Sequence, residues 1–216
     1  MKKYIITLVV LIIGNLCFAG NFSVYKLNNG QTVIIEQIKN NPIVTIDTWV
    51  RTGSINETDK TTGISHFLEH LFFKGTQAHP TGEFDKILES KGAITNAATS
   101  KDFTHYYITI ASNYFDLAAE LHADMLMHPQ IPRKEMEKER KVVLEEISKD
   151  LNSPSKILES SLTSMLYTNH PYKRRVIGKS EIIETITRDQ VLNFYNSHYA
   201  PSNMVTIVIG DVDSQH

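Results

Sequence analysis

The chain has 216 residues, of which 41% are hydrophobic, and a formal net charge of −2. This length and composition suit one large globular domain or two small ones. The nearly balanced charge gives no electrostatic basis for nucleic-acid binding, which depends on basic patches, so we expect no nucleic-acid partner.

The first residues have the three-part pattern of a secretory signal peptide. Lys2 and Lys3 precede an apolar run over residues 4–13, and Ala19 offers a small residue at the expected cleavage site. The run is short for a membrane-spanning helix, although an uncleaved membrane anchor stays open as the alternative. We therefore predict a signal peptide over residues 1–19 and an exported protein, either periplasmic or secreted.

Cleavage after Ala19 would also remove Cys17, which is the one cysteine of the chain. Disulfides, cysteine nucleophiles and thiolate zinc ligands are then excluded from the mature protein. Any metal site in that protein must be built from histidine, aspartate and glutamate side chains.

Residues 20–216 contain no linker-like segment and no internal repeat, so we predict a single domain there. Alternating apolar residues predict the first strands over residues 23–27, 32–37 and 43–51. Residues 28–30, Asn-Asn-Gly, supply a hairpin turn between the first two strands. Helical spacing follows over residues 63–75, and a shorter helix is predicted over residues 83–90.

Two strands then return, over residues 93–99 and 103–111, before helices dominate the chain. These helices are predicted over residues 115–125, 132–151, 155–167 and 187–198. A last buried strand is predicted over residues 204–209. The order of elements predicts an α+β fold, a mostly antiparallel sheet with helices packed on one face.

The segment GISHFLEHLFFKG, residues 63–75, places His66, Glu69 and His70 on one predicted helix. Residues four apart share a helix face, so His66 and His70 can direct two imidazoles at one metal ion. Glu69 lies one step around the helix, where it can hydrogen-bond a water on that metal without ligating it. The alternative is a helix edge with ordinary solvated histidines, which a third ligand would make less favoured.

The predicted helix over residues 132–151 is rich in acids, most of which we expect to form a solvated face. On a helical wheel, Glu139 and Glu146 lie together at the border of the apolar stripe, whereas Glu145 points away from it. Glu146 is therefore the candidate third ligand. The apolar stripe consists of Met136, Val143, Ile147 and Leu151.

The HFLEH segment, residues 66–70, followed much later by Glu146 in ERKVVLEEI, resembles the pitrilysin/insulinase family of inverted-zincin metallopeptidases. That family includes the mitochondrial processing peptidases. One departure is Arg175, where relatives usually carry proline, and we expect a local loop change there. Further stretches that resemble the family are residues 92–107, 170–178 and 198–212.

The resemblance implies a zinc-dependent endopeptidase that hydrolyses unfolded or extended peptides. His66, His70 and Glu146 would be the ligands of Zn²⁺, and Glu69 would be the general base. Glu139 would match a family glutamate that helps to orient the site. The resemblance does not identify the peptide substrate or the bond that is cut.

The segment TNAAT, residues 95–99, reads on pattern alone as a strand of small residues before a turn. In the family this strand lies at the edge of the sheet and pairs with an extended substrate peptide. Asn96 and Ala97 are therefore the expected substrate-binding residues.

Relatives usually carry two homologous α+β domains, and this chain ends after the last strand of the first one. We therefore expect a second homologous domain or subunit to complete the enzyme, with a homo- or hetero-dimer as one form. We also expect little activity from these 216 residues alone. The alternative function is that of a non-catalytic or weakly active partner subunit, which binds peptides within a two-part peptidase.

Overall fold

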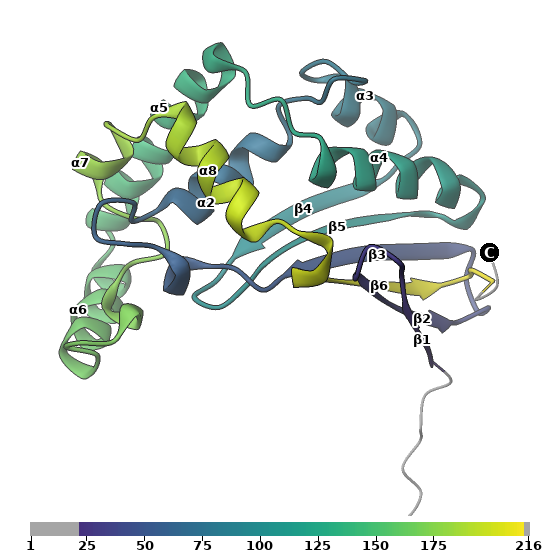
Figure 1. The fold of residues 1–216 in the computed structure, drawn as a ribbon, viewed down its shortest axis with the longest axis horizontal. Coiled ribbons are helices and arrows are strands. Elements are labelled where there is room, and N and C mark those ends of the chain that lie inside the picture. Colours follow the sequence, from purple (N-terminus) through teal and green to yellow (C-terminus); the bar gives the residue numbers. More distant parts are fainter. Residues whose placement is uncertain (1–21, 214–216) are drawn as a thin grey trace, which may run out of the picture.

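The computed structural model describes residues 22–213. One six-stranded mixed sheet lies along one side of the molecule, with helices covering one of its faces (Figure 1). The strands are β1 (Phe22–Lys26), β2 (Thr32–Gln37), β3 (Ile43–Val50), β4 (Ile94–Thr99), β5 (Thr104–Ala111) and β6 (Met204–Gly210). The α-helices are α2 (Ile64–Phe72), α3 (Glu83–Ser90), α4 (Phe115–Met127), α5 (Arg133–Leu151), α6 (Pro154–Leu166), α7 (Ser180–Ile183) and α8 (Arg188–His198).

The strand order across the sheet is β1-β2-β6-β3-β5-β4. Four of the neighbouring pairs are antiparallel, and β2 with β6 is the parallel pair among the described strands. The predicted α+β class, with a mostly antiparallel sheet and helices on one face, is confirmed. The sequence predicted β6 as a strand, but its insertion between β2 and β3 is a finding of the structure.

The two faces of the sheet differ because side chains alternate along β3 and β5. Val44, Ile46 and Val50 of β3 are buried under the helices, as are Tyr106 and Ile108 of β5. The residues that alternate with the buried ones, such as Asp47, Trp49 and Tyr107, point to the opposite face and stay partly exposed. This pattern is typical of an antiparallel sheet with one face in the core and one open.

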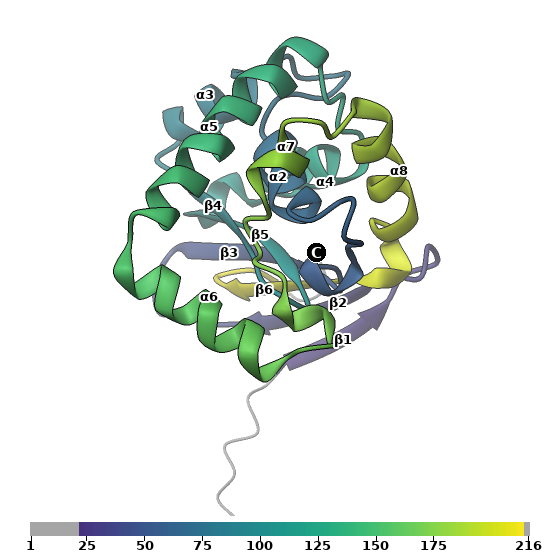
Figure 2. The ribbon, with the colours of Figure 1, turned by 90° about the vertical axis from the view of Figure 1, so that its left-hand side faces the viewer.

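α2 is the central helix of the structure. Ile64, Phe67, Leu68, Leu71 and Phe72 are all fully or almost fully buried. Figure 2 shows the helix between α5 and α8, above the sheet, and its contacts include both helices and β4. Because these neighbours cover most of its circumference, only the edge that carries the two histidines and the glutamate borders the outside.

α5 begins one residue later than predicted, since Pro132 is the N-cap residue and Arg133 the first helical one. Met136, Val143 and Ile147 are buried as expected. Leu151 was wrongly placed in the buried stripe: it is 55% exposed, because it lies in the last turn before the chain bends into α6.

The predicted signal peptide over residues 1–19 lies outside the described residues, so it stays a prediction. Within residues 22–213, no helix combines the length and apolarity needed to cross a membrane.

Candidate metal centre

A buried carboxylate fixes the start of α2. Glu57 accepts hydrogen bonds from the backbone N–H groups of Gly63, at 2.9 Å, and Ser65, at 3.0 Å. The first N–H groups of a helix have no partner within it, so this carboxylate satisfies two of them at the positive end of the helix dipole. Burial raises the pKa of Glu57 to about 7, against the opposing effect of these hydrogen bonds and of Arg174.

Two glycines bring another segment against the same helix end. Gly63 has φ 90°, Gly178 has φ 84°, and a Cβ on Gly63 would lie 2.8 Å from the Cα of Gly178. Only glycine combines this left-handed conformation with so close an approach of two backbones. The segment that contains Gly178 is therefore held against the start of α2.

Three side chains converge beside α2. Oε2 of Glu146 on α5 lies 3.7 Å from Nε2 of His66 and 3.6 Å from Nε2 of His70. Atoms that ligate one tetrahedral zinc ion at its usual bond lengths lie about 3.3 Å apart. One ligand atom from each residue lies within 4.8 Å of the others. The structure thus brings together the three residues predicted as ligands, at distances longer than those around a bound zinc ion.

Glu139 orients one of the two rings. Its Oε2 lies 3.2 Å from Nδ1 of His70, and its Oε1 lies 3.0 Å from Nζ of Lys74. When Nδ1 of His70 donates to this carboxylate, Nε2 of that ring keeps its lone pair for a metal. The lysine neutralises the carboxylate, which is only 13% exposed.

The protonation states suit metal binding. Burial, with a smaller effect of His70, lowers the pKa of His66 to about 4, so this ring is neutral at physiological pH. Neutral imidazole is the form that ligates metals. Burial raises the pKa of Glu69, although the hydroxyl of Thr99 donates a hydrogen bond to its carboxylate and lowers that pKa in part.

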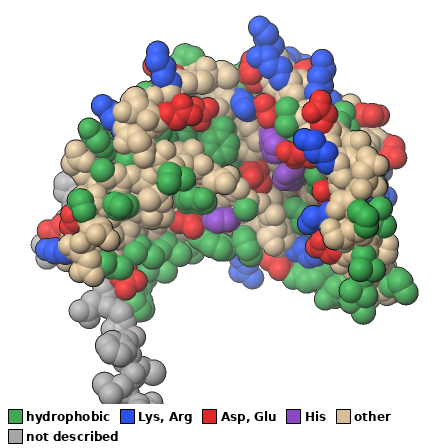
Figure 3. All heavy atoms as spheres, turned by 180° about the vertical axis from the view of Figure 1, so that it is seen from behind, with side chains coloured by type: hydrophobic (Ala, Val, Ile, Leu, Met, Phe, Trp, Pro, Cys, Tyr) green, Lys and Arg blue, Asp and Glu red, His purple; other side chains and the backbone are tan. Residues whose placement is uncertain are grey.

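The converging residues lie in an open cavity of about 500 Å³. Asn96 and Ala97 of the edge strand β4 line the same cavity, so the predicted substrate-binding residues lie beside the predicted ligands. The N–H of Ala97 bonds to Oδ1 of Asn96, at 2.8 Å, and is therefore not part of the β4–β5 ladder. On the face shown in Figure 3, histidine side chains reach the surface next to acidic ones.

Sequence reasoning missed Glu57, Lys74 and Thr99, each of which contacts the helix or a residue of the site. An acidic residue shortly before a helix is a recognisable signal, and it could have pointed to Glu57. Nothing local distinguishes Thr99, because its contact with Glu69 depends on the packing of β4 against α2.

Two imidazoles and a carboxylate, beside a further glutamate and an open strand edge, form a donor set that suits a metal ion with an open coordination position. The chain belongs to the insulinase family, peptidase family M16, whose sequence model matches residues 32–180. The predicted family is thereby confirmed. The model of the peptidase M16 inactive domain matches residues 185–216.

Two curated relatives and one solved structure illustrate the likeness. The chain is 34% identical over 191 residues to the uncharacterized zinc protease YmxG of Bacillus subtilis (strain 168), covering 87% of this chain and 46% of that protein. It is 33% identical over 198 residues to cytochrome b-c1 complex subunit 1 of Homo sapiens, covering 92% of this chain and 41% of that protein. The crystal structure of a protease from Helicobacter pylori superposes with a TM-score of 0.88 at 34% identity, covering 91% of this chain and 48% of that one. The chain therefore spans less than half the length of these proteins.

Proposed function

We propose that this chain carries the metal-binding half of a zinc endopeptidase that hydrolyses unfolded or extended peptides. The observation that carries the proposal is the convergence of His66, His70 and Glu146, with Glu139 bonded to the second ring. Membership of a family whose relatives include proteins named zinc proteases supports the same function.

The donor set suits Zn²⁺, which binds imidazole nitrogen and carboxylate oxygen and in hydrolytic sites keeps one position open. A bound zinc ion would supply Lewis acidity, polarising the peptide carbonyl and making a nearby water more acidic. His66, His70 and Glu146 would hold it, while Glu139 keeps the His70 ring in the required tautomer.

Glu69 has the position and environment of the general base. It takes a proton from the attacking water and returns that proton to the leaving amine, so it must change protonation state within one cycle. The hydroxyl of Thr99 holds the carboxylate in place through a hydrogen bond.

The free edge of β4 offers a place for the substrate. An extended peptide that adds to this edge gains main-chain hydrogen bonds, and the small side chain of Ala97 lets it approach closely. The N–H of Ala97 is available once the side chain of Asn96 turns away. Recognition through the backbone supports a preference for extended peptides over folded proteins.

A second homologous domain or subunit belongs to this proposal, as a homo- or hetero-dimer or within one longer polypeptide. The chain spans less than half of its relatives, and α6 presents an apolar surface that suits a protein partner. Figure 3 shows hydrophobic side chains gathered at the lower right, where α6 lies. The most exposed of them are Leu158, Leu162, Met165 and Leu166.

Two further points complete the proposal. We place the protein outside the cytoplasm, in the periplasm or secreted, on the basis of the signal-like pattern of residues 1–19. A partner subunit that binds peptides without cutting them is the second candidate function, and likeness to a subunit of the cytochrome b-c1 complex favours it.

The test is peptide hydrolysis measured together with metal content. Zinc-loaded protein and the Glu69→Gln variant are each incubated with unstructured, internally quenched peptides, in the presence of any second domain that co-purifies. We expect both proteins to hold one zinc per chain, and only the wild type to cleave. If both proteins bind peptides and neither cleaves them, the result favours the function of a partner subunit. If the wild type holds no zinc, the result refutes the proposed metal site.

A further inference from the structure

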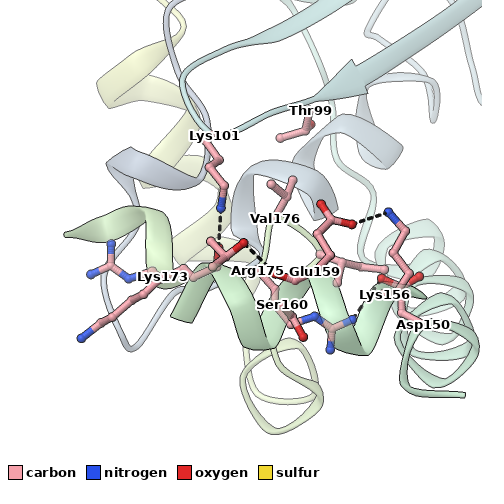
Figure 4. Close-up of a pocket in the computed structure, with 12 residues that line it drawn as sticks. Thr99, Lys101, Asp150, Lys156, Glu159, Ser160, Lys173, Arg175 and Val176 are labelled. Carbon is pink, nitrogen blue, oxygen red and sulfur yellow. Dashed lines mark hydrogen bonds and ion pairs between the residues drawn. The ribbon is translucent and has the colours of Figure 1, made fainter. Parts of the chain in front are cut away.

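A second cavity begins where β4 ends. It has a volume of about 250 Å³ and is lined by Thr99, Lys101, residues of α6 and the segment 173–177. Figure 4 shows Lys101 directed from the end of β4 toward the segment that carries Lys173 and Arg175, with Thr99 at the upper rim.

Thr99 joins this cavity to the candidate metal centre. Its hydroxyl donates a hydrogen bond to Glu69, and the same residue lines the second cavity. An extended peptide advances about 3.3 Å per residue. A peptide that lies along the free edge of β4 and continues past Thr99 therefore enters this cavity within about three residues of the reacting bond.

The two cavities carry opposite charge. The second is lined by five cations and two acids, giving 5 − 2 = +3. The cavity of the metal centre is lined by one lysine and four acids, giving 1 − 4 = −3 before any metal binds. The cations of the second cavity are Lys101, Lys156, Lys173, Arg174 and Arg175, and its acids are Asp150 and Glu159.

Its two acids are already paired. Glu159 lies 3.2 Å from Lys156, and Asp150 lies 3.0 Å from Arg175. Each of these pairs neutralises one cation, and Arg174 is paired with Asp59 outside the cavity lining, at 3.1 Å. The unpaired positive charge therefore rests on Lys101 and Lys173.

Lys101 carries the part of this excess nearest to β4. Its Nζ donates to the backbone carbonyls of Tyr172, at 2.7 Å, and Arg174, at 3.1 Å, and among the described residues it forms no ion pair. Burial lowers the pKa of Lys101, with Glu159 and Asp102 opposing that effect. This ammonium group has lost part of its water, bonds to two carbonyls and lies over the ring of Tyr172, so it gains from the direct contact of an incoming carboxylate.

Arg174 lies next to Lys101, and one nitrogen of its guanidinium group has no hydrogen-bond partner among the described residues. Its Nε donates to Asp59 at 3.1 Å, whereas Nη1 is buried and has no hydrogen-bond partner among the described residues. A guanidinium group stays charged, so Arg174, which also lines the cavity, adds positive potential there while it keeps its contact with Asp59.

We propose that this cavity is a specificity subsite that accepts an aspartate or glutamate side chain of the substrate, on the side of the scissile bond that lies toward Thr99. Lys101 is the main contact, and Arg174 supports it. The proposal rests on the peptidase function above and adds a substrate class to it.

The test uses matched peptides with the zinc-loaded protein, in the presence of any second domain that co-purifies with it. Each pair differs only by Glu or Gln at one position, scanned over three positions on either side of the cleaved bond. We expect kcat/KM to favour Glu by at least about 10-fold at one or two positions, all on the same side of that bond. In Lys101→Met the ratio of kcat/KM for the Glu peptide to that for the Gln peptide should lie within about 2-fold of one. In Lys101→Arg, which keeps the charge, most of the preference for Glu should remain. Lys134→Gln, an exposed lysine at the start of α5, is the matched control and should keep the wild-type ratio.

The remaining outcomes separate the two proposals. Cleavage of Glu and Gln peptides at equal rates would overturn the subsite and leave the peptidase intact. A preference that survives in Lys101→Met would also overturn it, provided that this variant still binds zinc. Absence of cleavage of every peptide, with zinc bound, would overturn both proposals.

Discussion

The carboxylate of Glu139 on α5 lies 3.2 Å from Nδ1 of His70 on α2. A residue of one helix thus sets the orientation of a candidate metal ligand on another, and Lys74 fixes that carboxylate from the far side. Partners of this kind typically contribute 10- to 100-fold to metal affinity, so about 10-fold weaker zinc binding is expected for Glu139→Gln and about 100-fold for Glu139→Ala. Competition with a chromophoric chelator measures both. Wild-type affinity in Glu139→Ala would contradict the role.

Glu146 and its neighbour Glu145 offer a matched comparison on one helix. Glu146 faces the two histidines, whereas Glu145 is exposed. Loss of a charged ligand should weaken zinc binding by more than about 100-fold in Glu146→Gln, while Glu145→Gln should bind zinc as the wild type does. Metal content after dialysis and chelator competition give the answer. Equal effects of the two substitutions would show that charge alone, and not ligation, controls binding.

Ala97 tests the role of the β4 edge. Because its N–H lies outside the β4–β5 ladder, proline at this position removes an outward donor and keeps the sheet. Loss of one hydrogen bond of about 1 kcal/mol predicts that Ala97→Pro lowers kcat/KM for an extended peptide roughly 5-fold, at unchanged zinc affinity. In Ala98→Pro, where the ladder itself is broken, thermal stability should fall as well. A peptide that reacts equally with Ala97→Pro and wild type does not pair at this edge.

His122 makes stability depend on pH. It is buried, its Nε2 is 2.9 Å from the hydroxyl of Thr48, and burial lowers its pKa to about 4 from 6.5. Below pH 6.5 this histidine takes up a proton in the unfolded chain but not in the folded one. Its contribution to the free energy of unfolding is therefore present above pH 6.5 and is lost as pH falls toward 4. The loss reaches roughly 3 kcal/mol. Urea unfolding of metal-free protein should show a flatter profile between pH 4 and 6.5 for His122→Gln, and an unchanged profile would refute this assignment.

Glu57 gives the free energy of unfolding a pH dependence of the opposite sign. Burial raises its pKa to about 7 from 4.5, so its favourable contribution is complete below pH 4.5 and is lost as pH rises through 7. The free energy of unfolding of wild type minus that of Glu57→Gln should therefore decrease between pH 4.5 and 8. The same unfolding series measures it. A difference that grows with pH would mean that the charged carboxylate is the stabilising form.

Local patterns predicted what depends on local physics. The turn at residues 28–30, the capping box of Thr187 and Gln190, and the shared face of His66 and His70 all follow from spacing along the chain. The helical wheel of α5 also placed Glu139 and Glu146 on one edge. The family resemblance then assigned them roles, which the metal-binding measurements above will test.

Long-range packing supplied what the sequence could not. The contact of Thr99 with Glu69 has no signature in spacing, because it depends on how β4 docks against α2. The same holds for Leu151, whose apolar character fits the stripe but whose position at a helix end exposes it. The basic cavity likewise appears only when α6 and the segment 173–177 meet the end of β4.

The position of β6 has a consequence for how the chain reaches its native state. Among the described strands, the β1–β2 hairpin joins the rest of the sheet only through β6, which lies far from the other five strands in the sequence. Until residues 204–210 emerge, the edges of β2 and β3 that they will join lack their native partner. Such non-local pairing slows folding, so the sheet can be completed only once residues 204–210 are available.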